Sequence, residues 1–121
     1  MIETTFEEVD QIFKNLARKR TPLNLTQTLQ KLVDLSGIGN EVEIYAKENA
    51  GHYGTCSGTI IEIPVSLSKF WGGEQFTEKQ QISSLAHELG HANAYLNNPS
   101  QYYSEEYAEA YKAEIISKLY A

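Results

Sequence analysis

The chain is poor in the residues on which several protein classes depend. Its single cysteine, Cys56, excludes an internal disulfide and is consistent with a reducing compartment. No apolar run approaches the length that crosses a bilayer, and the first residues lack the basic and apolar pattern of a secretory signal. Basic residues number only 10 against 16 acidic ones, so the formal charge is −6. We therefore expect a soluble cytoplasmic protein that binds neither membranes nor, directly, nucleic acids.

The composition is otherwise that of a globular domain. Hydrophobic residues make up 41% of the 121 residues and charged residues 21%, which argues against disorder. The sequence contains no internal repeat, low-complexity tract or interdomain linker. We therefore expect one domain over residues 1–121, long enough to bury most of its apolar surface.

Capping residues and apolar spacing predict two helices near the N-terminus. The first begins at Thr5, with Glu8 completing a capping box, and continues for about three turns before Pro22 breaks the pattern. The second runs from near Thr26 and ends at Gly37. Its apolar residues, expected to be buried, are Leu29, Leu32, Val33 and, at the margin of the stripe, Leu35.

The middle of the chain has the alternation of β-strands. From Glu41 the apolar residues Val42, Ile44 and Ala46 recur at every second position. A glycine-containing stretch follows, and residues 59–63 then predict a second strand that Pro64 closes. A hairpin or a small meander is the simplest arrangement of these strands. Residues 66–76 are too irregular to assign.

Two further helices are predicted at the C-terminal end. Thr77 and Gln80 form a second capping box, which opens a helix to about Leu96. The last helix starts at Asn98 or at Ser104, since either is a credible cap, and continues through Leu119. The order of elements predicts an α+β fold with N-terminal helices, a small antiparallel or mixed sheet and two C-terminal helices.

The third helix carries the sequence His87-Glu88-Leu89-Gly90-His91. Two imidazoles four residues apart lie on the same side of a helix, one turn from each other, so both can reach one metal ion. Glu88 is placed beside the ion and not on it, where it can take a proton from a water. The chain has three histidines, and two of them stand at this spacing. The pattern is typical of a zinc metallohydrolase.

A catalytic zinc site needs a third protein ligand, and the last helix offers carboxylates. On a helical wheel its buried face is defined by Ala108, Tyr111, Ile115, Ile116 and Leu119. Glu105 and Glu109 fall on or beside that face, whereas Glu106 and Glu114 point away. Because a carboxylate turned toward a core needs a charged partner, we expect Glu105 to be the third ligand. Glu109, one turn later, would accept a hydrogen bond from a ligating histidine.

Two other interpretations of these carboxylates are open. The roles can be reversed, with Glu109 as the ligand. Both side chains can also simply line an exposed first turn, where the helix dipole favours acidic residues, and this suits Glu105 if the helix begins after Ser104.

The residues of the two C-terminal helices resemble a known family. Leu85-Ala86-His87-Glu88-Leu89-Gly90-His91, followed by Glu105-x-x-Ala108-Glu109-x-Tyr111-x-Ala113-x-Ile115-Ile116, is similar to the ImmA/IrrE family of small gluzincin metallopeptidases. The resemblance covers roughly residues 54–116, and Glu109 stands where that family prefers Asp or Asn. It implies a minimal zincin-like fold in which residues 60–63 form the strand at the edge of the active-site cleft.

The resemblance also implies an activity: zinc-dependent hydrolysis of a peptide bond in a specific protein, such as a repressor of a mobile element or of a stress response. Glu88 would act as general base on the attacking water. The substrate chain could pair with the edge strand near residues 59–63. A phenol or imidazole would stabilise the oxyanion, and the candidates are Tyr95, Tyr102, Tyr103, Tyr107 and His52.

A different class of function is a non-catalytic module of a phage or mobile element, which binds zinc and acts by association. An intact Glu88 argues against that alternative, because a purely structural metal site has no use for a general base. The sequence leaves the oligomeric state open.

Overall fold

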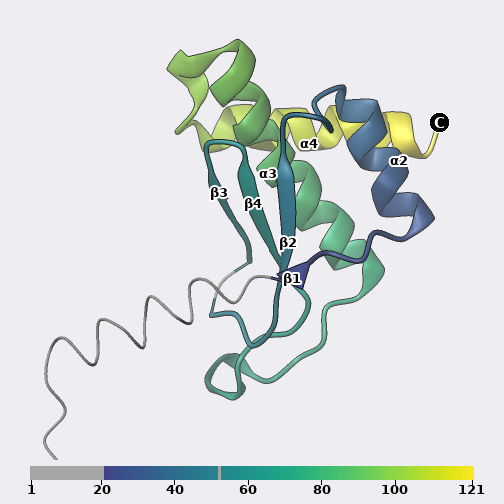
Figure 1. The fold of residues 1–121 in the computed structure, drawn as a ribbon, viewed down its shortest axis with the longest axis vertical. Coiled ribbons are helices and arrows are strands. Elements are labelled where there is room, and N and C mark those ends of the chain that lie inside the picture. Colours follow the sequence, from purple (N-terminus) through teal and green to yellow (C-terminus); the bar gives the residue numbers. More distant parts are fainter. Residues whose placement is uncertain (1–20, 52) are drawn as a thin grey trace, which may run out of the picture.

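A computed structural model describes residues 21–51 and 53–121 of the chain. The helix predicted from Thr5 and the side chain of His52 lie outside the described residues. The described part is an α+β fold with a small mixed sheet (Figure 1). In chain order its elements are β1 (Thr21–Pro22), α2 (Gln27–Ser36), β2 (Glu43–Lys47), β3 (Thr55–Ser57), β4 (Ile60–Pro64), the 3-10 helix η1 (Lys69–Trp71), α3 (Glu78–Asn97), the 3-10 helix η2 (Pro99–Gln101) and α4 (Glu105–Leu119).

The strands form a sheet in the order β1-β2-β4-β3. β3 and β4 make a tight antiparallel hairpin, but β2 pairs with β4 in parallel, with Ile44 opposite Ile61. The hairpin or meander predicted for the strand from Glu41 and the strand at residues 59–63 is therefore wrong, because these two strands pair in parallel and the antiparallel partner of β4 is β3, which was not predicted. A parallel pair requires a crossover connection, and here the chain passes through β3 before it returns as β4.

The edge strands of the described sheet are β1 and β3, not β4. β4 is paired on both sides, and its side chains Ile61 and Ile63 are fully buried. The expectations that residues 60–63 form the strand at the edge of the cleft and that residues 59–63 offer a free edge to the substrate are therefore wrong. Residues 55–57 form so short a strand, between Gly54 and Gly58, that alternation of apolar residues does not reveal it.

α2 has the predicted boundaries. The Thr26 side chain accepts a hydrogen bond from the Leu29 amide, and Gly37 ends the helix with a φ of 72°, which favours glycine. Leu29, Leu32 and Val33 are buried as expected, but Leu35 is exposed. At 100° per residue Leu35 lies roughly 110° from the centre of that stripe, so it leaves the core face.

α3 is the central helix. It packs against α2, α4, β3 and β4, and in Figure 1 α3 and α4 lie behind the sheet. The predicted capping box is confirmed: the Thr77 side chain accepts from the Gln80 amide, and the Gln80 side chain accepts from the Thr77 amide. The core between the layers is formed by Leu29, Leu32, Val33, Ile38, Ile61, Ile63, Ile82, Leu85, Ala86, Leu89, Ala92, Ile115 and Leu119.

Of the two starts considered for the last helix, Ser104 is correct. Its side chain accepts a hydrogen bond from the Tyr107 amide, and α4 begins at Glu105. Asn98 instead precedes the single turn of η2, which reverses the chain between α3 and α4. None of the described helices is both long and apolar enough to cross a membrane.

Candidate metal centre

The two imidazoles of α3 face each other on the side of the helix that is turned away from the core. Their Nε2 atoms are 3.2 Å apart, and both side chains are largely buried. Ala86, which precedes His87, and Leu89, which lies between the two histidines in the sequence, are fully buried. The helical period therefore fixes both rings on one edge of α3, as the sequence predicts.

The Nδ1 atom of each ring has an acceptor partner of its own. Nδ1 of His91 lies 2.8 Å from the carbonyl oxygen of Tyr102, which can only accept, so this nitrogen carries a proton. Nδ1 of His87 lies 3.4 Å from Oε1 of Glu109, which can also accept a proton from the ring. A ring that carries its proton on Nδ1 offers the lone pair of Nε2 to a metal ion.

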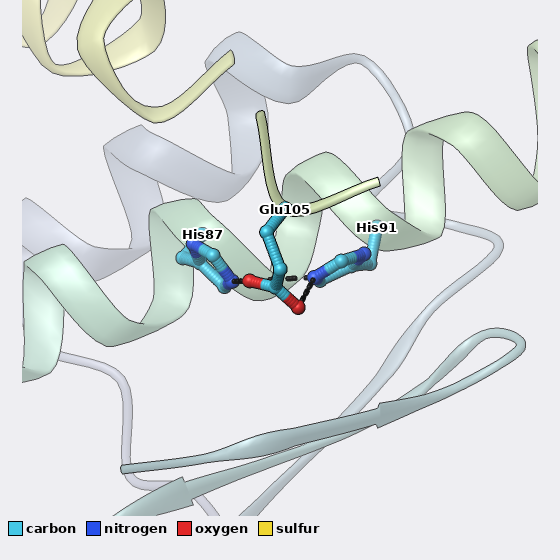
Figure 2. A group of neighbouring side chains, drawn as sticks. All are labelled: His87, His91 and Glu105. Atoms are coloured by element: carbon cyan, nitrogen blue, oxygen red, sulfur yellow. Dashed lines mark hydrogen bonds and ion pairs between the residues drawn. The ribbon is translucent and has the colours of Figure 1, made fainter. Parts of the chain in front are cut away.

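Glu105 closes the group from the opposite helix. Its Oε2 is 2.8 Å from Nε2 of His87, and its Oε1 is 3.3 Å from Nε2 of His91. Figure 2 shows the carboxylate between the two imidazoles, which both come from α3. The Ser104 cap starts α4 immediately before Glu105, so the first residue of one helix is held over the middle of the other.

These three side chains fit a metal ion. One ligand atom from each lies within 4.8 Å of the others. With the ring protons on Nδ1, two imidazole lone pairs and a carboxylate converge, an arrangement that a cation relieves. A tetrahedral ion with ligand distances of about 2.0–2.1 Å spaces its donors about 3.3–3.4 Å apart. The separations of 3.2 and 3.3 Å are close to that spacing, and the 2.8 Å from Nε2 of His87 to Oε2 of Glu105 is shorter. His87, His91 and Glu105 can therefore hold a metal ion.

Glu109 lies behind His87 and not among the converging atoms. It contacts Nδ1, and its other oxygen accepts from Lys112 Nζ at 2.6 Å. The hydrogen bond from Lys112 is the main reason that the pKa of Glu109 lies below its ordinary value. The sequence reasoning did not single out Lys112, although a lysine three residues after a glutamate on one helix face is a recognisable pair.

The two carboxylates are more exposed than the wheel argument assumed. The side chain of Glu105 is 73% exposed and that of Glu109 is 54% exposed. The premise that they turn into the core is wrong, because the first turns of α4 border an open cleft. Glu106 is exposed and Glu114 pairs with Lys118, so neither approaches the histidines. Glu105 is in the first turn of α4, where the helix dipole favours a negative charge. This position also lets its carboxylate contact the two histidines.

Glu88 is the buried carboxylate of the site, with only 7% of its surface exposed. Burial raises its pKa above the ordinary value, and the negative charge of Glu105 acts in the same direction. The imidazoles of His87 and His91 oppose this shift. A carboxylate in this setting is a stronger base than an exposed one.

Two hollows border the group, one on each side. The larger, of about 470 Å³, reaches past His87 to Tyr53 and Phe76, and the smaller, of about 280 Å³, reaches past His91 to Tyr103. Gly54, Glu88 and Glu105 line both hollows. The edge strand β3 begins at Thr55, directly after Gly54, so an open groove follows the sheet edge past the three side chains.

The four tyrosines considered as oxyanion donors have different surroundings in the structure. The Tyr102 hydroxyl is bonded to the β3–β4 hairpin, and the Tyr107 hydroxyl accepts from Asn93. Tyr95 packs on the Tyr102 ring and does not line either hollow. Tyr103 lines the smaller hollow, and 89% of its surface is exposed.

Cys56 lines the same hollow as His91. Its thiol donates to the Gly58 carbonyl at 3.3 Å. Burial, and secondarily the charge of Glu88, raises the pKa of the thiol from 9.0 to about 12. The side chain is therefore an unreactive thiol at neutral pH.

Comparison with known proteins finds no family model, no curated protein and no solved structure that matches the chain. The chemical interpretation of the site is therefore carried by its geometry.

Proposed function

We propose that the protein is a zinc-dependent metallopeptidase. The observation that carries the proposal is the convergence of two imidazole Nε2 atoms and the Glu105 carboxylate beside the buried Glu88. Two histidines and a carboxylate are a donor set of catalytic zinc sites, which leave one position for water or substrate. A purely structural zinc site would need a fourth protein ligand and no base beside it.

The site residues and a bound zinc ion would have separate roles in hydrolysis. A zinc ion bound there would supply Lewis acidity, which lowers the pKa of a water and polarises the scissile carbonyl. Glu88 takes the proton of the attacking water and passes it to the leaving amine. Its burial limits the contact of this carboxylate with water and favours the return of the proton to the substrate. Tyr103, which lines the smaller hollow, is the tyrosine that we assign as donor to the developing oxyanion.

The groove fits an extended peptide. In the described sheet β3 is an edge strand; Gly54, which precedes it, lines both hollows, and Thr55 and Cys56 line the smaller one. A substrate segment can pair with the outer edge of β3 and place its side chains in the hollows on either side of the scissile bond. Strand addition, expected from the sequence at residues 59–63, is therefore proposed at residues 55–57.

The resemblance to the ImmA/IrrE family supports the same activity and adds a zincin-like fold, in which α3 carries the motif and α4 the third ligand. It extends the proposal to a specific cytoplasmic protein substrate, such as a repressor of a mobile element or of a stress response. The order of the elements and the packing of α3 against the sheet support the fold part of this proposal.

The test compares Glu88→Gln with the wild type. Zinc is titrated into both metal-free proteins, and both are then incubated with a peptide library whose products are read by mass spectrometry. We expect one zinc per chain in each protein and cleavage only by the wild type, with a rate at least about a hundredfold above the variant. Equal zinc binding with no cleavage by either protein would favour a non-catalytic zinc-binding module.

A further inference from the structure

Tyr102 is joined to two parts of the site by different groups. Its backbone carbonyl accepts the Nδ1 proton of His91 at 2.8 Å. Its phenol oxygen accepts from the Gly58 amide at 2.7 Å and donates to the Cys56 carbonyl at 3.3 Å. One residue therefore touches a metal-binding histidine and the hairpin of the edge strand, although the two are more than thirty residues apart in the chain.

The edge strand is short, and Tyr102 holds its turn. β3 makes three residue pairs with β4, from Thr55 opposite Glu62 to Ser57 opposite Ile60, and it also packs against α3. The hairpin turn at Gly58 is covered by the Tyr95 ring, which in turn packs on Tyr102 at 5.3 Å between ring centroids. The Tyr102 hydroxyl and the two rings therefore contribute to the position of the turn.

The metal-binding side chains depend on the same residue. Tyr102 is the C-terminal cap of η2, and Glu105 begins α4 three residues later. A shift of Tyr102 would move the carbonyl that orients the His91 ring and the segment that leads to Glu105. An interaction that orients a metal ligand through its second ring nitrogen commonly changes metal affinity when it is lost.

We infer that Tyr102 is a positioning residue that couples the edge strand to the metal centre. When the β3–β4 hairpin is fixed in place, the motion of the His91 ring and of the start of α4 is restricted. When an ion binds His91, the motion of the hairpin is restricted in turn. Because coupling of two binding or ordering events is reciprocal, loss of the hydroxyl must weaken both. The inference rests on the proposed metal site, but it does not require peptidase activity.

Tyr102→Phe tests the coupling, since it removes the hydroxyl and keeps the carbonyl that contacts His91. Tyr107→Phe is the matched control: it also removes a phenol hydrogen bond, the one from Asn93 at 2.8 Å, but that bond involves neither the hairpin nor His91. Two quantities are measured on the full chain: the zinc dissociation constant, by competition with a chelator, and hydrogen exchange at the Gly58 amide, by NMR.

In the wild type we expect zinc to slow exchange at Gly58. Tyr102→Phe should speed that exchange in the metal-free protein, lose the response to zinc and raise the zinc dissociation constant by about fivefold or more. Tyr107→Phe should leave the constant within about twofold of the wild type. The inference is overturned if zinc leaves Gly58 exchange in the wild type unchanged, or if both variants have the same zinc affinity. A protein that shows the coupling and cleaves no peptide would contradict the peptidase proposal alone.

Discussion

Gly90 lies against Ala108 at a close approach of α3 and α4. A β-carbon on Gly90 would stand 2.9 Å from the Cα atom of Ala108 and 3.1 Å from its carbonyl oxygen. On α3, Gly90 is one residue before His91. On α4, Ala108 is three residues after Glu105. The close approach therefore sets the distance between the helix that carries the imidazoles and the helix that carries the carboxylate.

Gly90→Ala should consequently damage both stability and metal binding. The added methyl group meets backbone and not a flexible side chain, so the helices must separate, at a cost of about 1–3 kcal/mol. We expect a lower melting temperature and a weaker zinc affinity. Gly39→Ala is the control, because its methyl group would meet a side-chain atom of Val33, outside the group. Zinc affinity as strong in Gly90→Ala as in that control would contradict the assigned role of the close approach.

The ligand assignment predicts an order of effects among the glutamates of α4. Glu105→Ala removes a carboxylate from the converging group and should weaken zinc binding most. Glu109→Ala removes only the partner of His87 Nδ1, for which a loss of about 10–100-fold is typical. Glu106→Ala, at an exposed carboxylate of the same turn, should change little. Isothermal titration of the metal-free variants gives the order, and equal effects of Glu105→Ala and Glu106→Ala would remove Glu105 from the site.

The Cys56 thiol should be unusually slow to alkylate. Since its pKa is raised from 9.0 to about 12, the thiolate population near pH 8 falls by about a thousandfold. We expect iodoacetamide at pH 8 to modify the folded protein at least about a hundredfold more slowly than the urea-unfolded chain. Glu88→Gln removes the charge that contributes to the shift, so it should speed the reaction. Equal rates for the folded and unfolded chains would contradict the described burial.

The raised pKa of Glu88 predicts how stability depends on pH in the metal-free protein. A carboxyl group whose pKa in the folded state lies above its ordinary value of 4.5 favours folding most below that pH. This contribution is lost as the pH rises from 4.5 through the raised pKa. Glutamine does not titrate, so the melting temperature of Glu88→Gln relative to the wild type should increase over that window. Thermal melts from pH 4 to 8 measure the difference, and a constant or falling difference would contradict the shift.

The parts of the fold that depend on local sequence could be predicted. Thr77 and Gln80 identify the start of α3 because a capping box involves residues three apart, and Gly37 ends α2 because the backbone there has a positive φ. The facing of His87 and His91 follows from the helical period alone. In each case the deciding contacts lie within one or two turns of the same helix.

The parts that depend on long-range packing could not be predicted. β3 is too short to show a period, and the parallel pairing of β2 with β4 joins strands that are separated by the hairpin. The role of Tyr102 depends on where the turn between α3 and α4 lies relative to Gly58, 44 residues earlier. The wheel correctly selected the side of α4 that carries Glu105, but not the cleft that leaves this side chain exposed.

X-ray absorption at the zinc edge of the zinc-loaded wild type tests the central claim most directly. Because the proposal assigns His87, His91 and Glu105 as the ligands, we predict a shell of nitrogen and oxygen atoms at about 2.0–2.1 Å with the scattering pattern of two imidazoles. Cys56 lies in the adjoining hollow, so a sulfur atom at about 2.3 Å would be visible if the thiol bound the ion. Fewer than two imidazoles, or a sulfur ligand, would contradict the site as described.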